Sequence, residues 1–166
     1  MSATCPDTFR YPSNRLELPA RPTLVISQFP AKRADHLIAT HKPTETELIA
    51  VENFSWNPFM IPPEDHRIIT HRVLRYNIAH CNTHIFEGSS ADFYRQYKGE
   101  VPAMVFIDAC HLYEGVKEDI DWVVGLGVPV ISGHDYCDLH EGVRRAVDEV
   151  FGGDITAIGS VWSHRS

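Results

Sequence analysis

The sequence predicts an α/β fold, namely a Rossmann-like, doubly wound and mainly parallel sheet in a single compact domain. Short apolar runs alternate with segments of helical spacing along most of the chain, and this alternation is typical of βαβ units with right-handed crossovers. A length of 166 residues suits one domain with its own core. Polar residues directly follow several apolar runs, where sheets of this kind present ligand-binding groups.

The chain is predicted to consist of an N-terminal arm at residues 1–22 and a Rossmann-like domain at residues 23–166. Four prolines interrupt the mostly polar arm. Apolar patterning then places a strand at 23–26, a helix at 33–40, a strand at 48–51, a helix at 64–80 and a strand at 83–86. One face of the long helix, expected to point inward, is predicted to carry Ile68, Ile69, Val73, Tyr76 and Ile78.

The second half is expected to continue the same alternation. Ser89 or Ser90 would begin a short helix that runs through Tyr97. The remaining predicted elements are a strand at 103–107, a helix at 113–124, a strand at 128–132, a helix at 143–150 and a final β segment at 155–162. Two consecutive glycines, Gly152 and Gly153, mark the end of the last helix.

Composition excludes several classes of function. The formal net charge is −7 with histidine neutral, which argues against non-specific binding to nucleic acid. The N-terminus has no apolar signal core, and no segment is long and apolar enough to span a bilayer. The four cysteines show no CxxC spacing, as expected in a reducing compartment. We therefore expect a cytoplasmic protein with no membrane partner.

The ends of the fourth and fifth predicted strands carry the residues with the most chemistry. Asp108 and His111 follow the fourth strand, and His134 and Asp135 follow the fifth. If these strands are neighbours, two carboxylates and two imidazoles meet at one edge of the sheet. Such ligands suit Mg²⁺, Mn²⁺ or Fe²⁺, and a histidine that does not bind the metal is placed to act as a general base.

Two other interpretations of these strand ends stay open. Asp108 and Asp135 are also placed to cap the helices that follow them, since carboxylates accept hydrogen bonds from the first N–H groups of a helix. Cys110 and Cys137, together with the neighbouring histidines, would instead suit zinc, which prefers sulfur and nitrogen ligands.

The segment FIDACHLYEGVKEDI…GHDYCDLHEGVRRAVDEVF resembles the C-terminal half of class I S-adenosylmethionine-dependent methyltransferases. It is most similar to a small group with an FIDGDHSYEGV–GHDY pattern, related to metal-dependent macrolide-sugar O-methyltransferases and cephalosporin-hydroxylase-like proteins. The resemblance spans residues 83–162 and implies that the domain at residues 23–166 is of the methyltransferase type. It implies that Asp108 and Asp135 hold Mg²⁺ or Mn²⁺, with His134 as a third ligand where some relatives have glutamate. It also implies that His111 is the base acting on the acceptor hydroxyl.

The same resemblance implies a site for S-adenosylmethionine across the strand ends of the first half. The residues expected to contact this cofactor are Ser27, Gln28, Glu52, Ser89 and Asp108. Glu52 would accept hydrogen bonds from the ribose hydroxyls, whereas Ser89 is equally well placed to cap a helix. The chain departs from the family pattern after the first strand, because the usual glycine-rich turn is missing and the first glycine is Gly88.

These features predict an S-adenosylmethionine-dependent O-methyltransferase, assisted by a divalent metal, that acts on a hydroxylated small molecule or sugar. We also expect a homodimer, because the relatives often associate. The missing glycines favour an alternative, a degenerate methyltransferase-fold protein that has lost the cofactor and acts as a binding or scaffold module. A hydrolase or lyase that uses His111 and a metal-bound water is a third interpretation.

Overall fold

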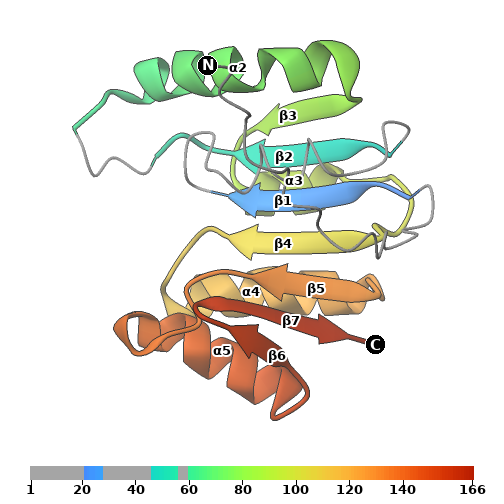
Figure 1. Cartoon of the computed structure of the whole chain (residues 1–166), viewed down its shortest axis with the longest axis vertical. Helices are drawn as coiled ribbons and strands as arrows, with labels where there is room; N and C mark the ends of the chain where they lie inside the picture. The colour runs from blue at the N-terminus through green and yellow to red at the C-terminus, as the bar shows by residue number, and fades with distance from the viewer. Residues whose placement is uncertain (1–20, 28–45, 56–59) are drawn as a thin grey trace, which may run out of the picture.

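The computed structural model describes residues 21–27, 46–55 and 60–166, which form one seven-stranded sheet (Figure 1). The strands are β1 Thr23–Ser27, β2 Leu48–Glu52, β3 Thr83–Glu87, β4 Met104–Asp108, β5 Val130–Gly133, β6 Thr156–Ile158 and β7 Val161–Arg165. Their order across the sheet is β3-β2-β1-β4-β5-β7-β6. β1 to β5 pair in parallel, and β7 is antiparallel to both β5 and β6. The predicted Rossmann-like, mainly parallel sheet is confirmed.

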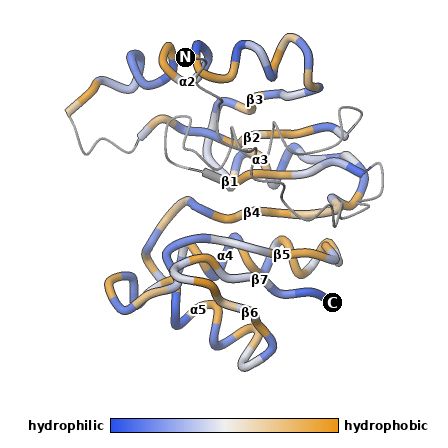
Figure 2. The backbone as a smooth tube through the Cα atoms, viewed as in Figure 1, coloured by the Kyte–Doolittle hydropathy of each residue, from blue (hydrophilic) through white to orange (hydrophobic). Residues whose placement is uncertain are grey.

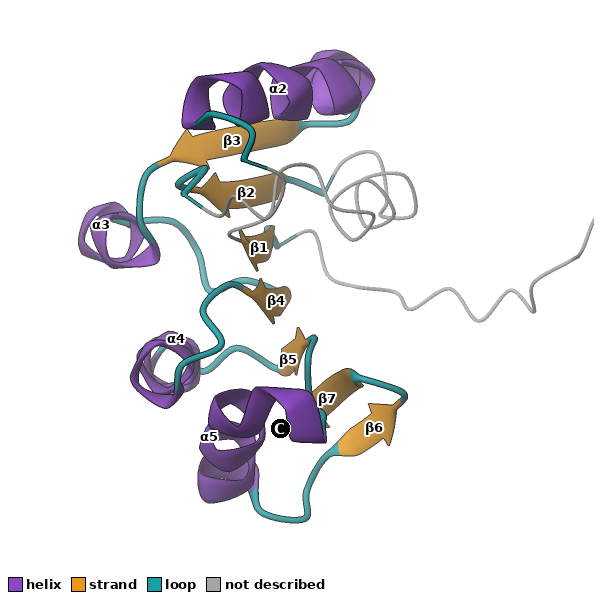
Figure 3. Ribbon diagram, turned by 90° about the vertical axis from the view of Figure 1, so that its left-hand side faces the viewer, coloured by secondary structure: helices purple, strands orange, loops and turns teal. Residues whose placement is uncertain are grey.

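The helices of the described residues are α2 Pro63–His80, α3 Ser90–Gln96, α4 Tyr113–Gly125 and α5 Glu141–Phe151, with the 3₁₀ turn η1 Asp138–His140 before α5. Figure 3 shows α3, α4 and α5 on one side of the sheet. It shows α2 beside β3, the edge strand of the sheet. The strand order reverses between β1 and β4, which is the switch point where such sheets bind ligands. The predicted helix at 33–40 and residues 1–20 of the predicted arm lie outside the described residues.

The main core lies between the sheet and the helices α3 to α5. The strand residues that form it are Leu24, Ile26, Val51, Val105, Ile107, Ile131 and Trp162. Side chains alternate along a strand, so Val25 and Phe106 lie on the opposite face, where they cluster with Leu48. Figure 2 shows the hydrophobic stretches of the central strands that supply both clusters. The sheet is therefore buried on both faces at its centre, as parallel sheets require.

The predicted inward face of α2 is wrong. The buried residues of this helix are His66, Thr70, Leu74 and Asn77. The five large apolar residues expected there are between 37% and 65% exposed. At 100° per residue these five positions spread around most of the helix, so they cannot share one buried stripe. The two-residue connection Cys81–Asn82, whose Asn82 has a φ of 46°, fixes how the end of α2 meets β3.

The C-terminus forms a hairpin where the sequence predicted a single β segment. Gly159 turns the chain between β6 and β7 with a φ of 61°, a conformation that favours glycine. The hairpin brings Trp162 next to β5, where its side chain is buried. The other described elements agree with the sequence predictions to within a few residues. Within the described ranges, none of the helices is both long enough and apolar enough to traverse a bilayer.

Candidate functional site

The carboxyl ends of the central strands form one row of polar residues. Ser27 at the end of β1 is in register with Glu52 on one side and with Asp108 on the other. The backbone N–H of His134, just after β5, donates to the carbonyl of Ile107 across 3.0 Å. The register of parallel strands thus places the ends of β2, β1, β4 and β5 along one edge of the sheet.

The structure brings together the three predicted metal ligands. One ligand atom from each of Asp108, His134 and Asp135 lies within 4.8 Å of the others. Asp108 is only 6% exposed, so this carboxylate lies at the bottom of the group. His134 Nδ1 lies 2.9 Å from Asp135 Oδ1, and its Nε2 lies 2.9 Å from the hydroxyl of Ser160 in the β6–β7 turn. Two carboxylates and one imidazole can therefore converge on a single point.

Two further histidines lie against the same carboxylate. His111 Nε2 is 2.8 Å from Asp135 Oδ2, and His140 Nε2 is 3.8 Å from Asp135 Oδ1. The two imidazole rings are 4.2 Å apart between their centres. Sequence reasoning placed His111 here but missed His140. The only signal available was its position, five residues after Asp135 and directly before the last core-facing helix.

The backbone around Asp135 is unusual. Its φ is 59°, in the left-handed region that L-residues other than Gly, Asn and Asp seldom adopt. The next backbone N–H, that of Tyr136, donates to the carbonyl of Ser160, and the N–H of Cys137 donates to the carbonyl of Asp135 itself. Aspartate tolerates this conformation better than most residues, because its short polar side chain can hydrogen-bond locally. This backbone conformation aims one carboxylate at three histidines.

Helix capping does not account for Asp108 or Asp135. The N-cap residue is Leu112 in α4 and His140 in α5, and neither helix start has a side-chain capping hydrogen bond. The cysteine–zinc alternative also finds no support. Among the described residues, the groups of three side chains close enough to share a metal contain histidine and aspartate but no cysteine.

The residues predicted to contact the cofactor have different surroundings. Glu52 is fully buried at the end of β2, and its carbonyl accepts a hydrogen bond from the N–H of Gly88. The hydroxyl of Ser89 accepts from the N–H of Asp92 and caps α3, which was the alternative interpretation for this residue. Gln28 lies outside the described residues. Cofactor contacts at these positions stay predictions.

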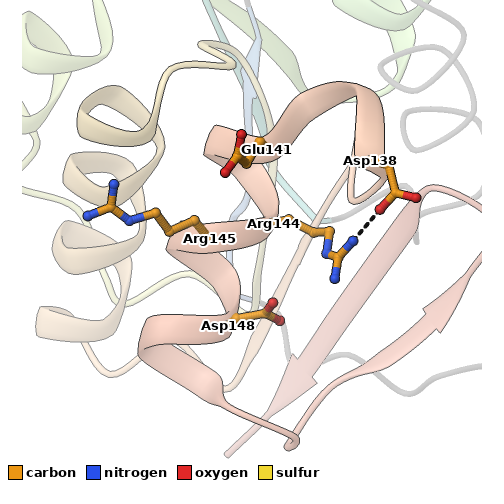
Figure 4. A pocket seen from close by; sticks show the side chains of 5 residues that line it. All are labelled: Asp138, Glu141, Arg144, Arg145 and Asp148. Atoms are coloured by element: carbon orange, nitrogen blue, oxygen red, sulfur yellow. Dashed lines mark hydrogen bonds and ion pairs between the residues drawn. The ribbon is translucent and has the colours of Figure 1, made fainter.

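A second charged region lies over η1 and α5 (Figure 4). A surface hollow there is lined by Asp138, Glu141, Arg144, Arg145 and Asp148. Both arginines have partners, because Arg144 pairs with Asp138 and the guanidinium of Arg145 lies 4.0 Å from the centre of the Tyr113 ring. Carboxylates outnumber arginines in this hollow, so its charge does not favour an anionic ligand.

Comparison with known proteins assigns the fold. No protein-family model matches the sequence, and no curated protein matches it either. An O-methyltransferase from Bacillus cereus in complex with SAH matches with a TM-score of 0.64 and 16% identity, over 88% of this chain and 74% of that protein. The O-methyltransferase TomG from Streptomyces achromogenes, in complex with SAM, gives 0.60 and 19%, over 88% and 73%.

A third solved structure extends the comparison to a sugar-modifying enzyme. The TDP-rhamnose 3′-O-methyltransferase of calicheamicin biosynthesis matches with a TM-score of 0.59 and 11% identity, over 90% of this chain and 72% of that protein. At such identities the similarity establishes the fold. The chain therefore has the Rossmann-like fold of class I S-adenosylmethionine-dependent O-methyltransferases.

Proposed function

We propose that the protein is an S-adenosylmethionine-dependent O-methyltransferase, assisted by a divalent metal, whose acceptor is a hydroxylated small molecule or sugar. The observation that carries this proposal is the group of Asp108, His134, Asp135 and His111 at the ends of β4 and β5, beside the switch point of a methyltransferase fold. The solved structures with this fold include proteins described as O-methyltransferases, one of them for a nucleotide sugar.

The donor atoms of the first three residues fit a divalent cation. Carboxylate oxygens from Asp108 and Asp135, with an imidazole nitrogen from His134, are ligands that Mn²⁺ accepts readily and that Mg²⁺ accepts in part. Asp108 is buried, whereas Asp135 and His134 are 14% and 37% exposed, so the group opens to solvent on one side. A bound cation supplies Lewis acidity, which lowers the pKa of an acceptor hydroxyl and orients it.

His111 is proposed as the general base. The carboxylate of Asp135, 2.8 Å from Nε2, favours the tautomer with its proton on that nitrogen, and Nδ1 is the atom proposed to take the proton from the acceptor. With S-adenosylmethionine bound, the acceptor oxygen would form its new bond to the methyl carbon as the carbon–sulfur bond breaks, and the electron pair of that bond would stay on the sulfur. Asp135 thus positions the base and keeps its protonated form stable.

The cofactor is proposed to lie over the ends of β1, β2 and β4. Glu52 is the residue proposed to bind the ribose hydroxyls, because a carboxylate at the end of the second strand suits that diol. Ser27, Gln28, Ser89 and Asp108 are the other proposed contacts. The absence of glycine before Gly88 supports the second candidate function, a scaffold or binding module that does not bind the cofactor.

Calorimetric titration with S-adenosylhomocysteine tests the cofactor site directly. We expect binding by the parent protein, and a Kd at least about tenfold weaker in Glu52→Gln, since a charged hydrogen bond contributes roughly 1.5–3 kcal/mol. Glu87→Gln is the matched control, because Glu87 is the same residue type in the same register one strand further on, paired with His71. Its Kd should stay within about twofold.

The possible outcomes separate the candidates. An absence of heat and of thermal stabilisation at millimolar ligand would remove the methyltransferase proposal and favour the scaffold. Binding that Glu52→Gln leaves intact would keep the fold-based proposal but reject the ribose assignment. Both variants must first show the thermal unfolding of a folded protein, because Glu52 is fully buried.

A further inference from the structure

We propose that His111, Asp135 and His140 form a binding site for a borderline transition metal such as Zn²⁺ or Co²⁺, which shares only Asp135 with the group of Asp108, His134 and Asp135. One ligand atom from each of the three lies within 4.8 Å of the others. The proposal concerns metal binding by the protein alone, and it does not depend on methyl transfer.

The spacing of the donor atoms fits such a metal after small side-chain rotations. Zinc–nitrogen bonds of about 2.0–2.1 Å in a tetrahedral site place neighbouring ligand atoms roughly 3.3 Å apart. The separations from the Asp135 oxygens are 2.8 Å to His111 Nε2 and 3.8 Å to His140 Nε2, on either side of that value. The two separations run to different oxygens of Asp135, so the carboxylate would bind through both oxygens or rotate to offer one of them.

The backbone that carries these side chains is held in place. A Cβ added at Gly142 would lie 2.3 Å from the carbonyl oxygen of His111 and 2.6 Å from the nitrogen of Tyr113, so only glycine allows α5 to approach the β4–α4 loop this closely. That approach brings His140 beside His111. The N–H of His140 donates to the carbonyl of Cys137, which fixes the turn between Asp135 and α5.

The donor set distinguishes the two groups chemically. Two imidazoles and one carboxylate favour zinc and its neighbours in the first transition row, whereas Mg²⁺ prefers oxygen ligands in an octahedron. The side chains of His111 and His140 are 29% and 30% exposed, although the Nε2 atom of His111 is itself buried against Asp135, so the metal would enter past the rims of the two rings. Open sites with three protein ligands are typical of exchangeable metals.

Asp135 belongs to both groups through different oxygens. Its Oδ2 faces His111, and its Oδ1 faces His134 and His140. A metal held by His111 and His140 therefore occupies the Nε2 atom and the carboxylate whose contact positions the proposed base. If the proposed function holds, Zn²⁺ should inhibit it, and His140→Ala should weaken that inhibition.

The test is a titration of the purified protein with Co²⁺, followed by visible absorption and by competition with Zn²⁺, without S-adenosylmethionine. We expect the parent to bind one Co²⁺, and His140→Ala to bind it at least about tenfold more weakly, since even losing a residue that supports a metal ligand costs about that much. Asp108→Asn is the matched variant from the other group, and its Co²⁺ affinity should stay within about threefold while its Mn²⁺ affinity falls.

Each other outcome would overturn the proposal. If the parent protein binds neither Co²⁺ nor Zn²⁺, the proposed site does not exist. Equal affinity in the parent and His140→Ala, with loss in Asp108→Asn or His134→Ala, would show one metal site that excludes His140. Unfolding curves identify any variant that has lost its structure, and His140→Gln then replaces the alanine variant. The cofactor titration is independent, so either proposal can fail alone.

Discussion

At the scale of single residues, Asp119 is a buried carboxyl in α4 that the proposed chemistry does not use. Burial raises the pKa of Asp119 from 3.8 to about 6, although the Tyr94 hydroxyl, 2.5 Å from its Oδ1, donates a hydrogen bond that favours the ionised form. Between these two pH values the folded protein holds a proton that the unfolded chain has released. The free energy of unfolding should therefore fall as pH rises from about 4 to about 6.

The variant Asp119→Asn should remove this dependence, because an amide cannot ionise but can still accept from Tyr94. We expect the variant to match the parent near pH 4 and to exceed it at pH 8 by up to about 3 kcal/mol, from a pKa difference of about two units. Denaturant unfolding at both pH values measures this. Asp121→Asn, an exposed aspartate of α4 paired with Lys117, is the control and should change stability by under about 1 kcal/mol.

A less stable Asn variant at pH 8 would contradict this account. It would mean that the hydrogen bond from Tyr94 to the ionised carboxylate outweighs the cost of burying the charge.

At the scale of secondary-structure elements, α2 buries a stripe that is mostly polar. Thr70 is fully buried, and its hydroxyl has no hydrogen-bond partner within the part of the chain that the structure describes. Thr83 is also buried, but its hydroxyl donates to the carbonyl of Cys81. Burying an unpaired hydroxyl costs about 1–3 kcal/mol. The two threonines therefore form a matched pair for testing what the unpaired polar groups of α2 cost the fold.

We expect Thr70→Val to raise the free energy of unfolding by about 1 kcal/mol and Thr83→Val to lower it by about the same amount. Leu74→Ala, at the one apolar position of the buried stripe, should cost about 2–5 kcal/mol. Chemical denaturation of the three variants measures these changes. A destabilised Thr70→Val would show that its hydroxyl bonds to water or to another polar group in solution.

The same elements show how far the sequence alone could lead. The spacing of apolar residues predicted the sheet. It also placed Asp108, His111, His134 and Asp135 together, because all four lie at the carboxyl ends of β4 and β5, which are parallel neighbours. The rotation of α2 was not predictable from apolar content, since its apolar residues do not form one stripe. His140 was missed because its place depends on the contact between Gly142 and the backbone of His111, which no sequence spacing encodes.

At the scale of the whole molecule, the proposed metal and the proposed cofactor contact different parts of the sheet. The histidines and aspartates of both metal groups lie between residues 108 and 140, after β4 and β5. The proposed cofactor contacts Ser27, Glu52 and Asp108 instead link the ends of β1 and β2 to that of β4. Because β1 pairs with both β2 and β4, cofactor binding would connect the β1–β3 side of the sheet to β4, whereas a metal would act on the ends of β4 and β5 only.

Amide hydrogen exchange should show this division. Ligands slow exchange most where they close local openings of the structure. We expect Mn²⁺ to slow exchange in peptides covering 108–113 and 133–141 and to leave 23–27 and 48–54 unchanged. S-adenosylhomocysteine should slow exchange in 23–27, 48–54 and the end of β4. Protection of the β1 and β2 ends by Mn²⁺ alone would instead mean that the metal groups and the cofactor surface form one cooperative unit. The separate assignments of Glu52 and Asp135 would then have to be joined.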